Sequence, residues 1–295
     1  MIRIVIFLSL LALPALIVHA VEPEDHLAAT EAWRAQRYAN LKKPDGYLSY
    51  IGSGPVAVGE SRVGSAPGND IVLPAGPAHL GWLTLAADGR VGFRSEPGGV
   101  GRIHGEAFDA VELLDQLQDG GPTRIDFGSQ WFYIVRLGEL TAWRLRDTQS
   151  PLRLGFTDID HYPVDPSWRI EADWEPFDPP RTLEYLTVAG TPDEGTVSGQ
   201  ATFERDGQRY TLTPTDADDG ELFFVFADRT SGRTSYGGGR FLYARAPENG
   251  KVVLDFNRAY NPPCALNSHV VCPTAPPENR LRLVIEAGEK KPDAH

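Results

Sequence analysis

The chain has 295 residues, 41% of them hydrophobic, so it is long enough for one large or two ordinary domains with packed cores. Its net charge of −12 argues against a general nucleic-acid-binding protein, because such proteins need basic patches to displace phosphate counterions. With 30 glycines and 24 prolines, many turns are expected, and short strands are favoured over long helices.

The first twenty residues have the form of a signal peptide. Arg3 precedes an apolar run from Ile4 to Val18, and Val18-His19-Ala20 places small residues where signal peptidase cuts. We expect cleavage after Ala20 and export, so that the protein is periplasmic or secreted. After cleavage no membrane span is expected. The alternative is that this segment is retained as an N-terminal anchor.

A helix is predicted within residues 21–46, the one convincing helical segment of the chain. Helix-favouring residues dominate EDHLAATEAWRAQRYANLKK, and Pro44 with Gly46 ends the segment. Trp33 and Leu41 lie eight residues apart, close to one face. We therefore expect a helix that packs over a sheet.

From Tyr47 onward the pattern indicates strands, and two hairpins are clear. One alternates about Asp88-Gly89 and the other about Asp206-Gly207, dipeptides that favour tight hairpin turns. The second hairpin has a defined register with two favourable cross-strand pairs. These pairs are Glu204 with Arg209 and Phe203 with Tyr210.

A third hairpin is predicted about Asn249-Gly250, with Glu248 opposite Lys251 and Tyr243 opposite Phe256. Strand alternation then separates a polar face from an aromatic one. The polar face carries Arg240, Asp255 and Asn257, and the aromatic face carries Phe241, Tyr243, Leu254 and Phe256. If the aromatic face is core, the other face forms a polar strip.

The predicted architecture is mainly β, with two β-rich domains after the helix. Residues 144–181 contain six prolines and few alternations, so we interpret them as a crossover and place the domain boundary near Ser150. The first domain is a β-sandwich over residues 47–150. The second, over residues 151–291, is an antiparallel β-sheet or barrel.

The stretch SRVGSAPGNDIVLPAGPAHLGWLTL resembles a forkhead-associated domain. The matching scaffold residues are Gly64, Asn69, Asp70, Ile71, Leu73 and His79. Two binding positions differ, because Ser65 stands where arginine is expected and Gly76 where serine is expected. Phosphate recognition needs those donors. The resemblance therefore implies a forkhead-associated-like β-sandwich without phosphopeptide binding.

Cys264 and Cys272 are the two cysteines of the chain, and export favours a disulfide between them. Closing this short loop would stabilise the fold by about 2.6 kcal/mol. Free thiols and a metal site are the alternatives. A zinc site would need two further ligands, and within the loop only His269 offers one.

The usual motifs of catalytic and nucleotide sites do not occur in the sequence. It has no G-x-S-x-G, H-E-x-x-H, Walker or G-x-G-x-x-G pattern. Asp158, Asp160, His161 and Asp165 suggest calcium, but the segment lacks the glycine and distal glutamate of an EF-hand loop. A solvated loop is favoured, and we predict no metal and no cofactor.

Three segments between Phe226 and Leu281 are similar to a bacterial family of domains of unknown function, number 1684. They are FADRTSGRTSYGGGRFLYA, LDFNRAYNPPCA and CPTAPPENRL. The opening W-R and PDGYL, together with NDIVLP, also fit the N-terminal part of that family. The resemblance implies no reaction, cofactor or catalytic residue. ALNSHVV and PTAPP depart from its pattern, so His269 receives no role from it.

The segment DFNRAYNPPCALNSHVVCP, residues 255–273, has two interpretations. As a structural corner, Asn261-Pro262-Pro263 ends a strand, Asp255 pairs with Arg240, and asparagines hold backbone groups. As a binding site, it offers donors, acceptors and aromatic walls for a small molecule. The candidate ligand-binding residues are Tyr236, Arg240, Asp255, Asn257, Tyr260, Asn261, Glu278 and Asn279.

We predict an exported binding or interaction protein with a polar pocket in its C-terminal half, where Arg240 would clamp a small anionic molecule. A protein partner in the cell envelope is the other candidate partner.

Catalysis is not favoured, because no nucleophile lies beside a base. One alternative is a hydrolase with Asp255 and Glu278 about 5–10 Å apart across a cleft. Another is a structural envelope protein without a small ligand. Burial and internal pairing of the polar strip would favour the corner over the pocket.

Overall fold

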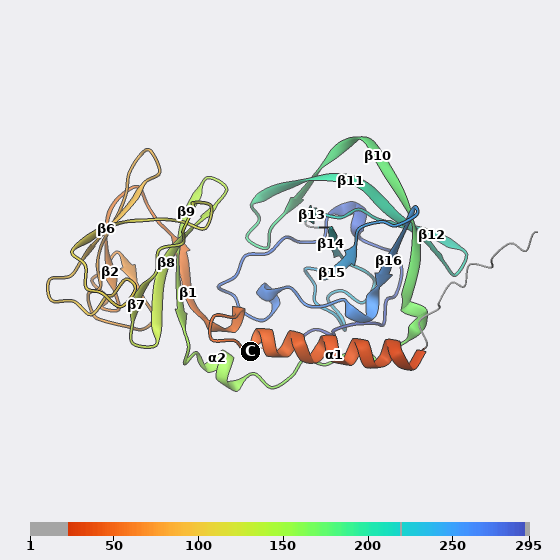
Figure 1. Ribbon diagram of the computed structural model, residues 1–295, viewed down its shortest axis with the longest axis horizontal. Helices are drawn as coiled ribbons and strands as arrows, with labels where there is room; N and C mark the ends of the chain where they lie inside the picture. Colours follow the sequence, from red (N-terminus) through yellow and green to blue (C-terminus); the bar gives the residue numbers. More distant parts are fainter. Residues whose placement is uncertain (1–22, 219, 293–295) are drawn as a thin grey trace, which may run out of the picture.

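The computed structural model describes residues 23–218 and 220–292 and is mainly β. Figure 1 shows two groups of strands side by side, with helix α1 (Pro23–Leu41) running along the second group. The predicted signal peptide lies outside the described residues. The prediction of a mainly β fold that follows one N-terminal helix is confirmed.

The first group consists of a four-stranded and a five-stranded sheet. The four-stranded sheet has the order β1 (Tyr50–Pro55), β9 (Leu140–Asp147), β8 (Gln130–Leu137), β7 (Ile125–Phe127). The five-stranded sheet has the order β3 (Ile71–Val72), β2 (Gly59–Gly64), β4 (Gly81–Leu85), β5 (Val91–Ser95), β6 (Ala110–Leu113). Both sheets contribute to one apolar core, which includes Val63, Leu83, Phe93, Phe132 and Leu145.

The hairpin predicted about Asp88-Gly89 is confirmed as β4 and β5. Leu83 pairs with Phe93, and both side chains are buried in the core. Gly89 has a φ of +87°, a left-handed conformation that glycine adopts without steric cost.

Asn69 and His79, from the forkhead-like segment, hold two loops of the first group together. The Asn69 Nδ2 atom donates to the carbonyl oxygens of Ala66 and Ala78 at 2.8 and 2.9 Å, and His79 Nδ1 lies 3.1 Å from Asn69 Oδ1. The Asn69 amide satisfies loop carbonyls that would otherwise need water, and His79 contacts that amide. They therefore fix the local backbone.

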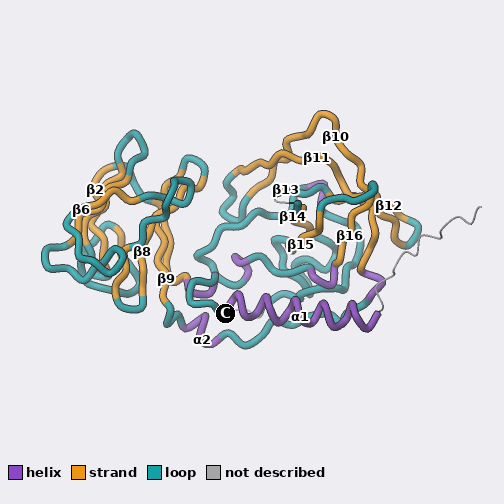
Figure 2. Tube along the Cα trace, in the orientation of Figure 1, coloured by secondary structure: helices purple, strands orange, loops and turns teal. Residues whose placement is uncertain are grey.

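The second group also has two sheets. One has the order β12 (Gln208–Leu212), β11 (Pro192–Arg205), β10 (Arg169–Leu186), β16 (Lys251–Asp255); the other is β13 (Asp216–Asp218), β14 (Glu221–Phe226), β15 (Arg240–Arg245). The long β10–β11 hairpin arches over the smaller sheet, so the two sheets form a half-barrel (Figures 1 and 2). Its core includes Phe203, Phe224, Phe226, Leu242, Leu254 and Phe256.

Short helices occupy the connections and the C-terminal segment. These are α2 (Pro151–Gly155), η1 (Tyr47–Ser49), η2 (Pro166–Trp168), η3 (Phe256–Arg258), η4 (Pro263–Ala265) and η5 (Pro277–Asn279). After η5 an extended segment alternates buried and exposed residues. Its buried members, Leu281, Leu283, Ile285 and Ala287, complete the second core.

Strand β10 corrects the prediction that residues 144–181 form a crossover. It contains Pro176, Pro179 and Pro180, which ordinarily argue against a strand. Its pairing with β11 shifts register between Pro176 and Arg181. Pro176 is the last paired residue before this interruption, and Pro179 and Pro180 lie inside it, where no amide donor is required.

The hairpin predicted about Asp206-Gly207 is confirmed in its full register, as β11 and β12. Phe203 pairs with Tyr210 and Glu204 pairs with Arg209. Asp206 and Gly207 have φ values of +53° and +71°, as the turn between two right-twisted strands requires.

The third predicted hairpin is correct at its turn and wrong beyond it. Glu248 and Lys251 form a bridge, but β15 then pairs with β14 and β16 with β10, in different sheets. Tyr243 lies opposite Phe223 rather than Phe256. Each strand pairs with a more distant segment because that pairing buries Leu242 and Leu254 in one core.

Candidate functional site

Most of the polar residues predicted to bind a ligand are buried and engaged by the protein itself. The structure shows Arg240, Asn257, Asn261 and Asn279 fully buried, and Asp255 is 8% exposed. Such groups need internal partners, because burial removes their hydrogen bonds to water. The partners of these residues show whether the segment is a structural corner or a ligand-binding pocket.

Arg240 pairs with Asp228, not with Asp255 as predicted. An Nη2–Oδ1 distance of 3.2 Å joins them, and both side chains have no exposed surface. The guanidinium also donates to the carbonyl oxygens of Ile285 and Ala287. Burial lowers the pKa of Arg240, and the charge of Asp228 opposes that shift. The Arg240 cation is thus used inside the core rather than offered to a ligand.

Asp255 and the residues after it form the surface on which α1 lies. His26 Nε2, near the start of α1, lies 2.9 Å from Asp255 Oδ2. Further along the helix, Arg37 donates to the carbonyl oxygen of Asn261 and forms an ion pair with the fully buried Glu289. The buried face of α1 is therefore largely polar, and the helix packs on η2 and η3 rather than over a sheet as predicted.

Two asparagines substitute for backbone partners in this region. Asn257 accepts from the Asp165 amide and donates to the Asp165 carbonyl, both at 2.9 Å. Asn279 does the same with Thr213, at 2.9 and 2.7 Å, and also donates to the carbonyl of Val225. Burial and internal pairing of Arg240, Asp255 and Asn257 favour the structural corner at this place.

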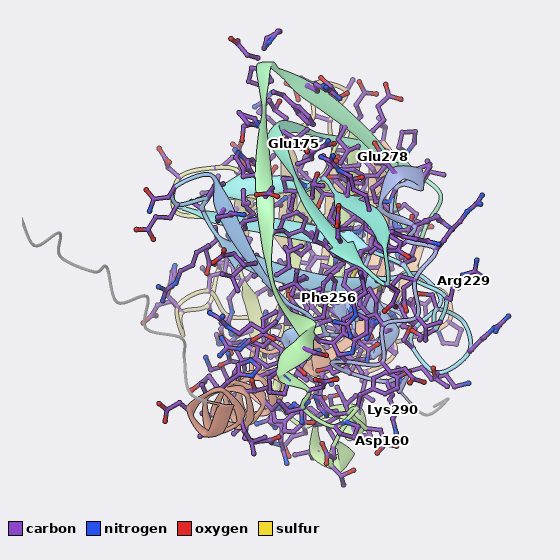
Figure 3. The ribbon with its side chains drawn as sticks, turned by 90° about the vertical axis from the view of Figure 1, so that its right-hand side faces the viewer. Asp160, Glu175, Arg229, Phe256, Glu278 and Lys290 are labelled. Atoms are coloured by element: carbon purple, nitrogen blue, oxygen red, sulfur yellow. The ribbon has the colours of Figure 1, made fainter. Side chains whose placement is uncertain are left out.

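Glu278 is exposed on η5 and lies apart from this corner. Figure 3 shows Glu278 well separated from Phe256, the residue that follows Asp255. Neither carboxylate lines either of the two cavities described below. The arrangement therefore does not support the alternative of a hydrolase in which Asp255 and Glu278 act together as acid and base.

His161 is a titratable side chain beneath α1. Its Nδ1 lies 3.1 Å from the Tyr38 hydroxyl, and its Nε2 lies 4.0 Å from Glu289 Oε1. Burial, followed by the charge of Arg34, lowers the pKa of His161 below its ordinary 6.5, although Glu289 and Asp158 oppose the shift. The unfolded chain therefore binds a proton at this site more readily than the folded protein does.

We expect the free energy of unfolding to fall as the pH drops below 6.5, because the unfolded chain takes up this proton first. For each unit by which the folded pKa lies below the unfolded one, complete acidification lowers the free energy of unfolding by about 1.4 kcal/mol. The variant His161→Phe keeps a ring against Tyr38 but cannot titrate, so its loss of stability on acidification should be shallower. Urea unfolding at a series of pH values measures both slopes, and equal slopes would contradict the assignment.

A cavity of about 620 Å³ lies where α1, the first group of strands and the second group meet. We call it the junction cavity. Its aromatic lining comprises Trp33, Tyr47, Tyr50, Phe241, Tyr243 and Tyr260. Tyr47 and Tyr243 are 47% and 50% exposed, so part of each ring is accessible to a ligand.

The aromatic lining has two sides, and each carries an arginine over a tyrosine ring. On one side the Arg37 guanidinium lies 4.3 Å from the centre of the Tyr260 ring, and Tyr243 stacks on Tyr260. On the other side the Arg146 guanidinium lies 3.9 Å from the centre of the Tyr50 ring. A ring-shaped ligand can stack on such rings, and Arg146, which has no carboxylate partner among the described residues, favours one that carries negative charge.

The charge of Arg146 is not neutralised by a carboxylate within the described part of the chain. Arg146 donates to the carbonyl oxygens of Asp45 and Gly46 and to the hydroxyls of Tyr50 and Tyr133, all of them neutral. Lys43 also lines the cavity. In a chain of net charge −12, this is a local positive site.

A second cavity, of about 680 Å³, lies on the other side of η4, and we call it the thiol cavity. Its walls include Ser150, Ser235, Tyr236, Cys264, His269 and Lys291. Both cysteines are free thiols in this structure, and the Cys264 amide donates to Cys272 Sγ at 3.2 Å. The structure thus shows the reduced form of the predicted pair, and the disulfide stays a prediction.

Of the eight predicted site residues, Tyr260 lines the junction cavity and Tyr236 the thiol cavity. The other six line neither. Sequence reasoning missed most of the junction lining, including Arg37, Tyr50 and Arg146. Each arginine stacks on a tyrosine that lies far away in the sequence, Arg37 on Tyr260 and Arg146 on Tyr50, so no local pattern marked these pairs.

No group of three or more potential metal-binding side chains occurs among residues 23–218 and 220–292. Over the same residues, no helix combines the length and the apolar character needed to cross a membrane.

Two comparisons with known proteins give matches. Residues 154–290 match the model of a family described as a protein of unknown function, DUF1684. The solution structure of an uncharacterized protein from gene locus rrnAC0354 of Haloarcula marismortui is 30% identical. That match covers 48% of this chain and 81% of that chain, with a TM-score of 0.40. No curated protein matches the chain. Neither description names an activity.

Proposed function

Because residues 154–290 belong to the DUF1684 family, whose description assigns no activity, we propose a function from the geometry. The chain is an exported protein that binds, and does not transform, a small anionic molecule that contains a planar or sugar ring. The ligand binds in the junction cavity. The observation that carries this proposal is the pair of arginine–tyrosine contacts among the residues that line that cavity.

The size and chemistry of the junction cavity support a small ligand. Its volume of about 620 Å³ falls in the range of small-molecule sites. Apolar and aromatic walls with a few polar groups are the usual composition of such sites. Arg146, Asn40 and Gln36 can donate hydrogen bonds, and Arg146 adds a charge that a carboxylate or phosphate would satisfy.

Binding is favoured over catalysis because of what the cavity lacks. Among its described lining residues the one carboxylate is Asp45, and there is no histidine, serine or cysteine beside it. Acid–base or nucleophilic catalysis needs such groups within hydrogen-bond reach of the reacting atoms. Export is supported by the form of the first twenty residues.

We expect native mass spectrometry of the protein, purified gently from the exported fraction of its own source, to show an additional bound mass. The variants Arg146→Gln and Tyr243→Ala should lose it, because they remove the uncompensated cation and an exposed ring of the cavity. Loss of a charge-assisted hydrogen bond weakens binding by about 1.5–3 kcal/mol, or roughly 10–100-fold.

The matched control is Arg94→Gln. Arg94 also lies over an aromatic ring, 4.0 Å from the centre of Trp82, but on β5 and outside the junction cavity. It should keep the bound mass, and circular dichroism should show every variant folded. A wild type without a bound small molecule, or folded cavity variants that retain it, would refute the proposal.

A further inference from the structure

The thiol cavity offers chemistry that ligand binding in the junction cavity does not use. Cys264 is half-buried and lines the cavity, whereas Cys272 is 4% exposed and does not line it. The Cys264 amide donates to Cys272 Sγ at 3.2 Å, so the two residues are in direct contact. One cysteine is thus presented to a cavity, and a second stands directly behind it.

The surroundings distinguish the two thiols further. Hydrogen bonding from Cys272, opposed by burial and assisted by the Tyr236 hydroxyl, lowers the pKa of Cys264. The same contact, followed by burial, raises the pKa of Cys272. Burial raises the pKa of Tyr236 to about 12, so its hydroxyl remains protonated and can donate to the Cys264 sulfur. An accessible thiol that ionises readily is the one that attacks disulfides.

The loop between the cysteines is held without a covalent bond. Asn267 Nδ2 donates to the carbonyl oxygens of Tyr47 and Tyr50 at 3.0 and 2.9 Å, and Arg144 donates to the carbonyl of His269. These bonds tie the loop to the first group of strands. The loop therefore has anchors besides any bond between the two sulfur atoms.

We propose that Cys264 and Cys272 form a thiol–disulfide exchange site whose substrate is a small disulfide bound in the thiol cavity. The Cys264 thiolate attacks one sulfur of the substrate, RSSR, so the substrate S–S bond breaks and a mixed disulfide forms. The first RS⁻ leaves and takes a proton. The deprotonated sulfur of Cys272 then attacks the Cys264 sulfur, forms the internal disulfide and releases the second RS⁻, which is protonated by the proton that Cys272 gave up.

The reaction balances, because one substrate disulfide is reduced to two thiols while two protein thiols are oxidised to one disulfide. The cavity volume of about 680 Å³ suits a low-molecular-mass disulfide. Lys291 on its wall favours a substrate that carries carboxylates. This inference does not rest on the proposed function, since it concerns a different cavity and different residues.

The test treats the reduced full chain with glutathione disulfide and measures intact masses. In Cys272→Ser the resolving thiol is gone but a hydrogen-bond donor remains, so one glutathione should stay attached at Cys264. In Cys264→Ser the buried Cys272 should take up none. The wild type should carry no adduct and should form the internal disulfide instead, which reduced glutathione should open again in the folded protein.

The variant Tyr236→Phe adds a second measurement, the rate of exchange at neutral pH, which would not change if the two cysteines had only a structural role. Tyr236→Phe removes the hydroxyl that stabilises the Cys264 thiolate, so exchange at neutral pH should slow by about threefold for each unit by which the pKa rises. Circular dichroism verifies that each variant is folded. The absence of an adduct in folded Cys272→Ser would overturn the proposal. So would a wild-type disulfide that reduced glutathione cannot open without unfolding the protein.

Discussion

Replacing Asp228 with alanine is expected to lower the free energy of unfolding by about 3–5 kcal/mol, because it leaves the Arg240 charge buried without its partner. Asp228 also accepts hydrogen bonds from the amides of Thr230 and Ile285, at 3.2 and 2.7 Å. The substitution therefore strips a buried cation and two buried amides at once. Urea or guanidinium unfolding, followed by circular dichroism, measures the loss.

The variant Asp228→Asn separates charge from hydrogen bonding, since the amide retains one acceptor oxygen but carries no charge. The double variant Asp228→Asn/Arg240→Met should recover part of the lost stability, because no unpaired charge remains in the core. The control is Arg90→Gln, which breaks the exposed pair with Asp88, keeps the turn residue and should change stability little. A loss of about 1 kcal/mol or less for Asp228→Ala, as for an exposed pair, would contradict this account.

The hairpins show how far local sequence determines this fold. At Asp206-Gly207 the turn residues, the alternation and the cross-strand pairs all agree, and the structure has that register. At Asn249-Gly250 the turn forms as well, yet its two strands pair with β14 and β10. A turn dipeptide specifies a reversal of the chain, but the partner of each strand depends on which pairing buries Leu242 and Leu254.

The polar strip shows why a site is harder to predict than a strand. Arg240, Asp255 and Asn257 stand out in the sequence as specialised residues, but the sequence does not show which residues they meet. Asp255 meets His26 from α1, and Arg240 meets Asp228. The same residue types could bind a ligand or one another, and only the positions of those partners decide between the two.

The cavities could not be predicted for a related reason. The junction cavity combines one face of α1 with residues from β1, β9 and β15, and no local pattern links these segments. Arg37 illustrates the difficulty, because in the sequence it is one of several charged residues in a helix. In the structure it supports Tyr260 and pairs with Glu289.

Replacing Glu289 with alanine is expected to lower the free energy of unfolding by about 3–5 kcal/mol and to loosen α1 in particular. The Glu289 side chain has no exposed surface and pairs with Arg37, whose side chain is 13% exposed. Glu289 also accepts from the Asn261 amide at 2.7 Å. Its loss leaves the Arg37 cation and that amide unsatisfied along the line where α1 meets the corner.

Amide hydrogen exchange distinguishes a local effect from a global one. The helix keeps two other anchors, since His26 still meets Asp255 and Arg34 still donates to the carbonyl of Tyr162 at 3.2 Å. Exchange in residues 33–41 should therefore accelerate more than exchange in β14 or β15. The control Asp25→Ala removes an exposed carboxylate from the same helix and should leave exchange nearly unchanged.

Arg37→Met/Glu289→Met tests whether the unpaired charge is the cause, because it removes both charges and keeps apolar volume. This double variant should be more stable than Glu289→Ala. The double variant also separates the two roles of Arg37, which are to anchor α1 and to line the junction cavity. We expect α1 to stay packed in this variant, although the cavity loses the Arg37 side chain. A folded double variant whose ligand affinity falls would place Arg37 in binding as well as in anchoring. If exchange in Glu289→Ala instead rises equally throughout the chain, α1 and the half-barrel unfold as one unit.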